Sequence, residues 1–423
     1  MGVSRSAGLT SGQTAYFDYL AAGYPETATA LNCRVTTAKP ISAIESAANE
    51  LVARHEILRT SFETPVIAPA FSLSVDQRPT QVARETSSAV VETTAALSLD
   101  SIEARHAREA RADPFAQSGP AIRIGARELD CGGSEAIITV GHMFADGAGM
   151  HDLKQDLRAL LDTRPLKAPV HPIDVALLER SSEWVGRSER NLAHIEHLLH
   201  RHAGRLSWAA QPSWAFGRQY EVKSSALAEC VSVISNNLRI SPASVVIGAI
   251  GAVDCDVSGH GSSLIRSLFT RPRPGSGLYL APHNLNAFIE VDAATSAASK
   301  SLLIRAHESA LRGYRRTEYD VTRLAAVQAA VAEQNDLAGL DRFLILNFLD
   351  DSAGSSINNQ HVEVAEVIRR PAVPYTYAFV DYIRRAGFDQ LKVTCPIAGD
   401  VDPADFGSRL TSLLARWRGQ ISM

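Results

Sequence analysis

The sequence predicts an α/β protein built from two halves of similar size. Segments with apolar residues at helical spacing alternate with short apolar runs typical of strands along most of the 423 residues. No pattern repeats at intervals of about 20–50 residues, which argues against solenoids and propellers. The stretch from Thr163 to Pro172 contains three prolines, which end helices and disfavour central strands. We therefore expect one lobe at residues 1–165 and a second at residues 173–423.

The first half alternates helix and strand patterns. Ile41, Ile44, Ala48 and Leu51 recur at helical spacing, so they share one apolar helix face. In chain order, the expected elements are a helix at Ser11–Ala22, a strand at Ala30–Thr37, a helix at Ile41–His55, strands at Leu58–Phe62, Ala121–Arg127 and Ala136–Val140, and a helix at Met150–Leu161. The run at Ala136–Val140 is short and largely apolar, which is typical of a central strand.

The second half repeats the mixture. Its expected helices are Ser181–Leu206, Pro242–Val253, Ala297–Arg315, Asp320–Gln334 and Pro403–Arg418. Its expected strands are Ser263–Phe269, Asn286–Val291, Phe343–Phe348, Tyr375–Ile383 and Gln390–Cys395.

The overall composition argues against several classes of function. The net charge is only −4, and no long run of one sign appears, so we expect no nucleic-acid partner. The longest apolar stretch, at residues 243–253, is about half of the roughly 20 residues that a membrane-spanning helix needs. Five scattered cysteines without a CxxC pair favour reduced thiols. We expect a cytoplasmic monomer.

One segment joins an apolar strand to a histidine, an aspartate and glycines at short fixed spacing. His142 follows the strand candidate, and Asp146, Gly147 and Gly149 follow His142. A histidine can take a proton from an attacking amine or hydroxyl at neutral pH. The two glycines permit close approaches that a Cβ resists. A lone histidine after an apolar strand is more often a core residue than a catalyst, so this segment alone does not assign a function.

Several further blocks make the chain resemble the condensation domains of non-ribosomal peptide synthetases, within the chloramphenicol acetyltransferase superfamily. The family signature is His-His-x-x-x-Asp-Gly, which His142, Asp146 and Gly147 match. The other matching blocks follow in the family's order: Leu9–Tyr19, Leu51–Phe62, Asp113-Pro114-Phe115 with Gly119-Pro120, Arg271-Pro272-Arg273-Pro274, Asn286, Ala310–Val327 and Leu346-Asn347-Phe348. Ordered matches of this kind extend over about residues 8–415.

The resemblance implies two chloramphenicol-acetyltransferase-like lobes in a V-shaped pseudo-dimer, with a central tunnel and His142 midway. A donor thioester enters from one side and an acceptor from the other. His142 acts as a base or as a positioning hydrogen-bond partner. Asp146 is structural and is paired with Arg271, since an unpaired buried charge is costly. The amide of Gly147 helps to stabilise the oxyanion.

The resemblance also implies a substrate-binding role for Asn286. Two positions depart from the family pattern. Gly141 replaces the first histidine of the signature, so a supporting hydrogen bond is missing. Ala148 replaces a bulkier residue, which leaves more room for substrate beside His142. The second histidine and the Asp-Gly pair remain, which favours an active enzyme.

We expect a free-standing condensation enzyme of secondary metabolism. It transfers an acyl or aminoacyl group from the phosphopantetheine arm of a carrier protein to a small-molecule amine or alcohol. A coenzyme-A-dependent acyltransferase acting on a natural product or lipid is the alternative, and a non-catalytic docking module is a third possibility. No cofactor is expected to stay bound.

Two further clusters stay open or are set aside. The histidines at 194, 197, 200 and 202 lack further ligands at metal-binding spacing, so we expect no metal site there. Three interpretations stay open for the basic cluster at Arg312, Arg315 and Arg316. It contacts the acidic surface of a carrier protein, it binds a phosphate, or it forms a solvated helix face.

Overall fold

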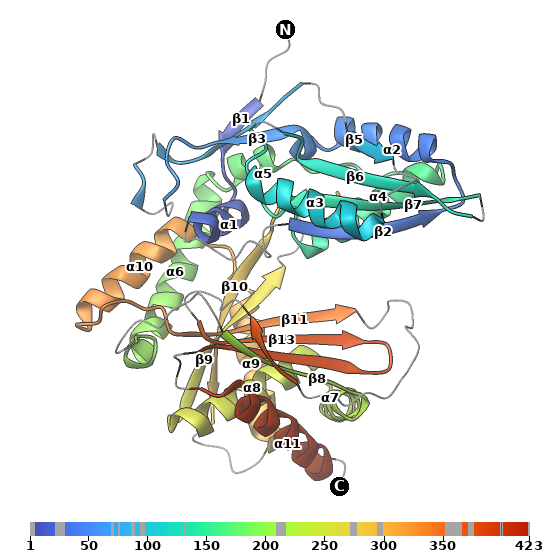
Figure 1. The fold of residues 1–423 in the computed structure, drawn as a ribbon. Coiled ribbons are helices and arrows are strands. Elements are labelled where there is room, and N and C mark those ends of the chain that lie inside the picture. Colours follow the sequence, from blue (N-terminus) through green and yellow to red (C-terminus); the bar gives the residue numbers. More distant parts are fainter. Residues whose placement is uncertain are drawn as a thin grey trace. The chain divides into compact units, whose positions relative to one another are not determined.

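The computed structural model describes residues 5–21, 30–68, 72–74, 77–85, 89–93, 98–117, 119–130, 132–208, 217–270, 277–293, 299–351, 366–370, 376–397, 399 and 401–421. Helices and strands are mixed along the chain, as the sequence predicts (Figure 1). The chain divides into two compact units. The first unit comprises Met1–Gly186, Thr270–Leu285 and Asp320–Thr322, and the second comprises Arg187–Phe269, Asn286–Tyr319 and Arg323–Met423.

The first unit contains a three-stranded sheet of order β1-β4-β3 and a four-stranded sheet of order β2-β7-β6-β5. Its elements are β1 (Arg5–Gly8), α1 (Ser11–Ala21), β2 (Ala30–Thr37), α2 (Ile41–Arg54), a 3-10 turn (Glu56–Arg59), β3 (Thr60–Glu63), β4 (Thr80–Ala83), β5 (Val90–Thr93), α3 (Leu99–Ala112), β6 (Ile122–Glu128), β7 (Ser134–Gly141), α4 (Gly147–Leu161) and α5 (Pro172–Leu178).

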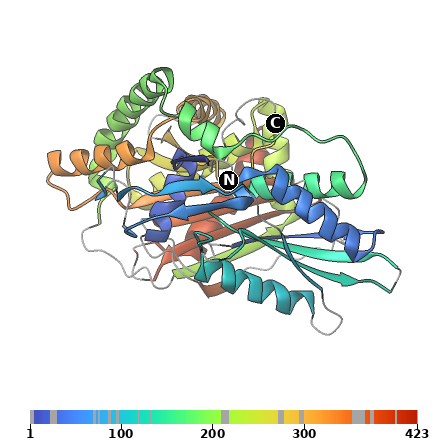
Figure 2. The same cartoon turned by 90° about the horizontal axis from the view of Figure 1, so that it is seen from above.

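Strand β7 lies inside the four-stranded sheet and is covered on both faces. Ile138 and Val140 belong to the core that α2 and α4 share with the sheet. Ile137 points to the other face, where it packs against Ile102 of α3. Figure 2 shows α2 and α3 on opposite sides of these strands. Because both faces of β7 are buried, its central residues are mostly apolar, and its end is held firmly in place.

The second unit is built on a seven-stranded sheet of order β10-β9-β11-β13-β14-β8-β12. Its elements are α6 (Ser182–His202, whose first turn belongs to the first unit), a 3-10 turn (Ala203–Arg205), β8 (Gly217–Ser224), α7 (Ser225–Leu238), α8 (Pro242–Ser258), β9 (Ser262–Thr270), β10 (Asn284–Asp292), α9 (Ser299–Tyr314), α10 (Val321–Gln334), β11 (Phe343–Asp351), β12 (Glu366–Arg370), β13 (Thr376–Arg385), β14 (Asp389–Pro396) and α11 (Pro403–Ile421).

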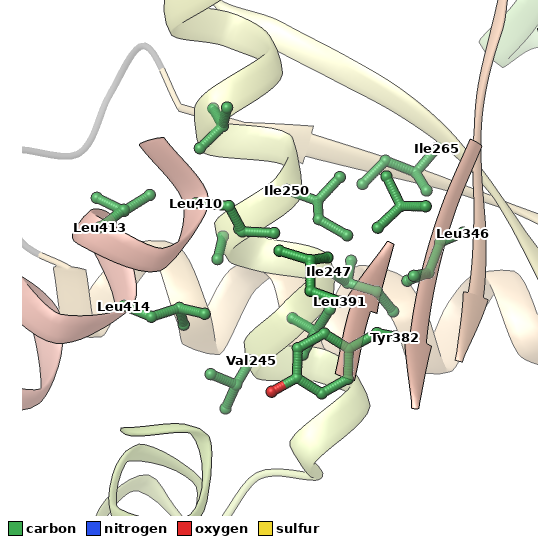
Figure 3. Packing of buried hydrophobic residues seen from close by; sticks show 14 of the residues in the cluster. Val245, Ile247, Ile250, Ile265, Leu346, Tyr382, Leu391, Leu410, Leu413 and Leu414 are labelled. Atoms are coloured by element: carbon green, nitrogen blue, oxygen red, sulfur yellow. The ribbon is translucent and has the colours of Figure 1, made fainter. Parts of the chain in front are cut away.

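The core of the second unit lies between one face of this sheet and the helices α7, α8, α9 and α11. Figure 3 shows Ile247 of α8 and Leu410 of α11 on the side of the sheet to which Leu346 and Leu391 contribute. A glycine brings α8 close to β10, because a Cβ at Gly251 would lie 2.5 Å from the side chain of Val291. The Gly248-to-Gly251 pattern is thus a helix-packing feature.

The division of the chain differs from the expected lobes at residues 1–165 and 173–423. Helix α5 belongs to the first unit, because Ile173 and Ala176 pack there against Ala7 and Ala83. The proline-rich stretch is also not a free linker: the amide of Val170 donates to the carbonyl of Leu278 over 2.8 Å. Prolines end regular helices, but they do not prevent the residues between them from pairing with another segment.

The predicted helices and strands all correspond to observed elements, with two notable shifts. Residues 56–59 form a 3-10 turn, so β3 begins only at Thr60. Helix α4 begins at Gly147 and not at Met150, because Asp146 caps it. The elements missing from the prediction are β1, β4, β5, α3, α5, β8, α7 and β12. Several of these strands have only four or five residues, too few for a clear alternating pattern.

Among the residues described, no single helix is both long and apolar enough to cross a membrane. Helices α7 and α8 pass that test of length and composition only as a pair, with a bend of 108° between them.

Candidate active site

His142 lies in a tight turn between the end of β7 and the start of α4. The amide of Phe144 donates to the carbonyl of Gly141 over 2.9 Å and closes this turn. Asp146 then caps α4 with its side chain. The turn is therefore fixed by a central strand on one side and a capped helix on the other. This arrangement fixes the backbone that carries His142.

The imidazole of His142 is stacked against the ring of Tyr16 in α1. The ring centroids are 3.6 Å apart, and the planes differ by 27°. The sequence placed Tyr16 only within the expected helix at Ser11–Ala22. Nothing in its local pattern could have identified the partner, because α1 and β7 meet only in the folded unit. The stack restricts the orientation of the imidazole and shields one of its faces from water.

Burial lowers the pKa of His142 to about 3, while the carbonyl groups of His142 and Ala145 oppose this more weakly. The Nδ1 atom is buried and has no hydrogen-bond partner among the described residues. A charged imidazolium would lose its hydration here without gaining a carboxylate partner. The ring is therefore neutral at physiological pH.

The carboxylate of Asp146 is a structural brace. Its Oδ1 accepts from the amide of Gly149 over 2.8 Å, which caps α4. Its Oδ2 accepts from the amide of His283 over 2.9 Å. Asp146 thus ties the histidine turn to a segment 137 residues away in the chain. The expected partner, Arg271, lies outside the described residues, so its pairing with Asp146 stays a prediction.

Two glycines let the segment around residues 280–283 approach this turn closely. A Cβ at Gly149 would lie 1.9 Å from the carbonyl oxygen of Leu280. A Cβ at Gly12 of α1 would lie 2.1 Å from the carbonyl oxygen of Pro282. The expectation that Gly149 permits a close approach is confirmed. The contacting segment itself was missed, because a glycine indicates that something comes near but not what comes near.

Gly147 and Ala148 occupy the first turn of α4 directly after the cap. Gly147 is exposed, Ala148 is half-buried, and a Cβ at Gly147 would meet nothing within 4 Å. Amides in the first turn of a helix have no intrahelical acceptor and carry the positive end of the helix dipole. The geometry thus leaves the Gly147 amide open to an anion, and its glycine is not required for packing.

Gly141, which replaces the first histidine of the family signature, lies in the last position of β7. A Cβ there would lie 3.3 Å from the ring of Phe144, which packs against Phe62 with centroids 5.1 Å apart. The side of the turn that a first histidine would occupy is therefore taken by an aromatic core contact.

Asn286 belongs to the second unit, in β10. Tyr319 fixes its backbone: the hydroxyl accepts from the Asn286 amide over 3.1 Å and donates to the Asn286 carbonyl over 2.8 Å. The side-chain Oδ1 is buried without a hydrogen-bond partner within the described ranges. His142, Asp146, Gly147 and Ala148 are thus brought together in one turn, whereas Asn286 is a separate feature of the other unit.

The part of the chain that the structure describes contains no group of three or more side chains suited to a metal ion. His202 of the histidine-rich helix contacts Glu290 over 2.9 Å, and His200 contacts Asn335 over 3.3 Å. These histidines hold α6 against neighbouring elements.

No protein-family model matches the sequence, and no curated protein matches it significantly. Solved structures match over nearly the whole chain. The condensation domain that mediates chain release from the enacyloxin polyketide synthase is 16% identical with a TM-score of 0.71, covering 100% of this chain and 85% of its own. The condensation domain of the Monacolin K polyketide synthase MokA is 13% identical with a TM-score of 0.73, covering 99% and 98%. The chain has the condensation-domain fold.

This fold confirms the α/β fold with two lobes predicted from the sequence. The V-shaped arrangement with a central tunnel stays a prediction. The condensation-domain fold is also used for other reactions. The epimerization domain from the third module of tyrocidine synthetase B is 12% identical with a TM-score of 0.69, covering 99% of this chain and 97% of its own. A shared fold does not by itself fix the chemistry, so the reaction must be argued from the site.

Proposed function

We propose that this protein is an acyltransferase that condenses a thioester-bound acyl group with an amine or alcohol, using His142. The observation that carries the proposal is the placement of a neutral His142 beside the open first turn of α4, in a chain with the condensation-domain fold.

The proposed reaction needs three parts. The nitrogen or oxygen of the acceptor attacks the carbonyl carbon of the thioester and gives up a proton. The carbonyl oxygen then carries negative charge, and the Gly147 amide stabilises it. The carbon–sulfur bond breaks as the intermediate collapses, and the leaving thiolate takes up the proton. An amide or ester and a free thiol result, so no further reactant is required.

The neutral state of His142 supports a role as hydrogen-bond acceptor for the nucleophile. A ring with a pKa of about 3 holds a whole proton poorly, which disfavours a long-lived imidazolium. Its neutral form accepts a hydrogen bond at one ring nitrogen and aligns the attacking group. We therefore favour positioning over complete proton removal before attack.

The donor in this proposal is an acyl group on the phosphopantetheine arm of a carrier protein. The comparison with the enacyloxin condensation domain, which mediates chain release from a polyketide synthase, supports this choice. We place the reaction in the cytoplasm, in line with the free thiols at Cys33, Cys230, Cys255 and Cys395.

The test offers the same acyl group to the purified protein on a carrier protein and on coenzyme A, with a panel of amines and alcohols. Mass spectrometry of the products measures turnover. We expect acyl transfer from the carrier, and a loss of at least about 100-fold in His142→Ala. Equal turnover with both donors would contradict a strict carrier requirement, and full activity of His142→Ala would contradict the proposed chemistry.

A further inference from the structure

The seven-stranded sheet of the second unit has one face in the helix-covered core, and its other face carries polar residues among apolar ones such as Phe288 and Ile345. Residues alternate in direction along a strand, so neighbours of core residues point to the opposite face. The core side carries Val380 of β13, Val393 of β14 and Tyr220 of β8. The residues that follow or precede these, including Asp381 and Lys392, therefore belong to the other face. This is the face opposite α7, α8, α9 and α11.

Asn286 lies on the same face. Its neighbours Leu285 and Ala287 are buried, and Ala287 belongs to the helix-covered core. Phe288 is the next residue of β10 that points to the same face as Asn286. The guanidinium of Arg266 in β9 lies 5.7 Å from the centre of the Phe288 ring. The face therefore unites the expected substrate-binding asparagine with further polar groups that sequence reasoning did not single out.

A row of polar residues crosses four strands of this face. The strand pairing sets Asn347 of β11 opposite Asp381, Asp381 opposite Lys392, and Lys392 opposite Glu221 of β8. Side chains in such a row lie about 5 Å from their neighbours. Asn286 is three strands away from Asp381, at about 14 Å.

Asp381 is the least compensated charge in this row. Its Oδ1 accepts from Nδ2 of Asn347 over 2.8 Å, a neutral partner. Burial raises the pKa of Asp381, while the hydrogen bond from Asn347 and the charge of Lys392 oppose this. A desolvated carboxylate lowers stability when its hydrogen-bond partner is neutral and its neighbouring cation, Lys392, also acts on Glu221, so its presence on a half-buried face points to a ligand.

Glu221, in the same row, is fully supported. It accepts from Gln390 over 2.6 Å and pairs with Lys223 over 3.4 Å. The positive charge of Lys392 lowers the pKa of Glu221 as well as opposing the raised pKa of Asp381, so this charge is shared between two carboxylates. The two acids therefore differ in what remains unsatisfied. Asp381 is available to a cation from outside, whereas Glu221 is already paired.

We propose that Asp381, oriented by Asn347, binds a positively charged amino group of the ligand that occupies this sheet face. The proposal rests on the proposed function in one respect: the ligand is then the acceptor, and Asp381 selects acceptors that carry an ammonium group in addition to the nucleophile. The charge and hydrogen bonding of the carboxylate fit an ammonium better than a hydroxyl.

Two matched probes test this site: hexane-1,6-diamine and hexane-1,6-diol. Both are linear six-carbon chains with a polar group at each end, but only the diamine carries ammonium groups at neutral pH. Calorimetric titration of the full chain measures binding without any need for turnover. We expect the diamine to bind more tightly than the diol. Asp381→Asn weakens diamine binding by about tenfold, as expected for a lost charge-assisted hydrogen bond. The matched control Glu221→Gln leaves it unchanged.

Thermal unfolding of each variant checks the fold, and Asp381→Ser serves as a second test if the asparagine variant is unstable. Equal diamine affinity in the wild type and in the folded Asp381 variants overturns the inference, as does a wild-type preference for the diol. A different outcome would contradict the proposed function alone. In that outcome the diamine binds in an Asp381-dependent manner, but no acyl transfer to it is detected with any thioester. Acyl transfer without Asp381-dependent discrimination leaves the function standing and removes the site.

Discussion

The ring of Tyr16 covers the imidazole of His142 at a centroid distance of 3.6 Å. The two residues come from α1 and from the turn after β7, and their stacking fixes the plane of the proposed functional group. We expect Tyr16→Phe to keep both the stack and the activity. Tyr16→Leu should lower turnover about tenfold, because the imidazole loses its fixed orientation.

A merely structural role of Tyr16 would not change the ionisation of His142, so NMR titration of the imidazole distinguishes the two. In Tyr16→Leu, water reaches the ring and the pKa of His142 should rise from about 3 toward its ordinary value. If the pKa of His142 stays unchanged in Tyr16→Leu while the thermal stability falls, Tyr16 contributes only to packing.

The ionisation of His142 also predicts how stability depends on pH. An unfolded chain has a histidine pKa near 6.5, while that of His142 in the folded protein is about 3. Between these values the unfolded state binds more protons, so the stability that the neutral ring contributes is complete above about pH 6.5 and is lost as the pH falls toward 3. Urea unfolding at pH 7 and pH 5 should show a smaller loss in His142→Gln than in the wild type. Equal losses in both proteins would contradict the lowered pKa.

The amide of Gly147 can be removed without removing the helix. Gly147 is the first residue of α4, a position that tolerates proline because its N–H has no intrahelical partner. We expect Gly147→Pro to fold but to lose about 100-fold in turnover, as for the loss of one oxyanion donor. Gly147→Ala keeps the amide and meets nothing within 4 Å, so it should stay active. Equal activity of the two variants would exclude the proposed oxyanion role.

At Gly149, two residues further along α4, an added Cβ should lower the stability of the fold. A Cβ at Gly149 would lie 1.9 Å from the carbonyl oxygen of Leu280, so Gly149→Ala forces the backbone apart. We expect a loss of about 1–3 kcal/mol in the free energy of unfolding. Denaturant titration measures it, with Gly147→Ala as the control two residues away. A loss no greater than that of the control would show that the segment at Leu280 moves freely.

Removal of the brace at Asp146 should cost stability from two sources. Asp146→Ala leaves α4 without its cap and removes the carboxylate that accepts from the buried amide of His283. These losses together amount to about 3 kcal/mol of unfolding free energy. Hydrogen exchange at the amides of Gly149 and His283 should accelerate in the variant. Unchanged protection at His283 would mean that another group anchors this segment.

The order of helices and strands follows from local patterns, and the strand–turn–helix around His142 follows from them as well. An apolar run such as Ala136–Val140 needs burial on both faces wherever it lies, so its strand could be predicted. Short elements such as β4, with four residues, carry too little pattern and were missed. The extent of the first unit was also misjudged, because the contact between Val170 and Leu278 joins segments far apart in the chain.

By itself, the sequence determined the fold class, the position of His142 at the end of a buried strand, and the need for a close approach at Gly149. Only the tertiary structure decided which groups meet there. It placed Tyr16 on His142, the amide of His283 on Asp146, and Asp381 in one row with Asn347. The physical reason is that periodicity and glycine positions report the local environment of a residue, whereas a contact between distant segments depends on how whole elements pack.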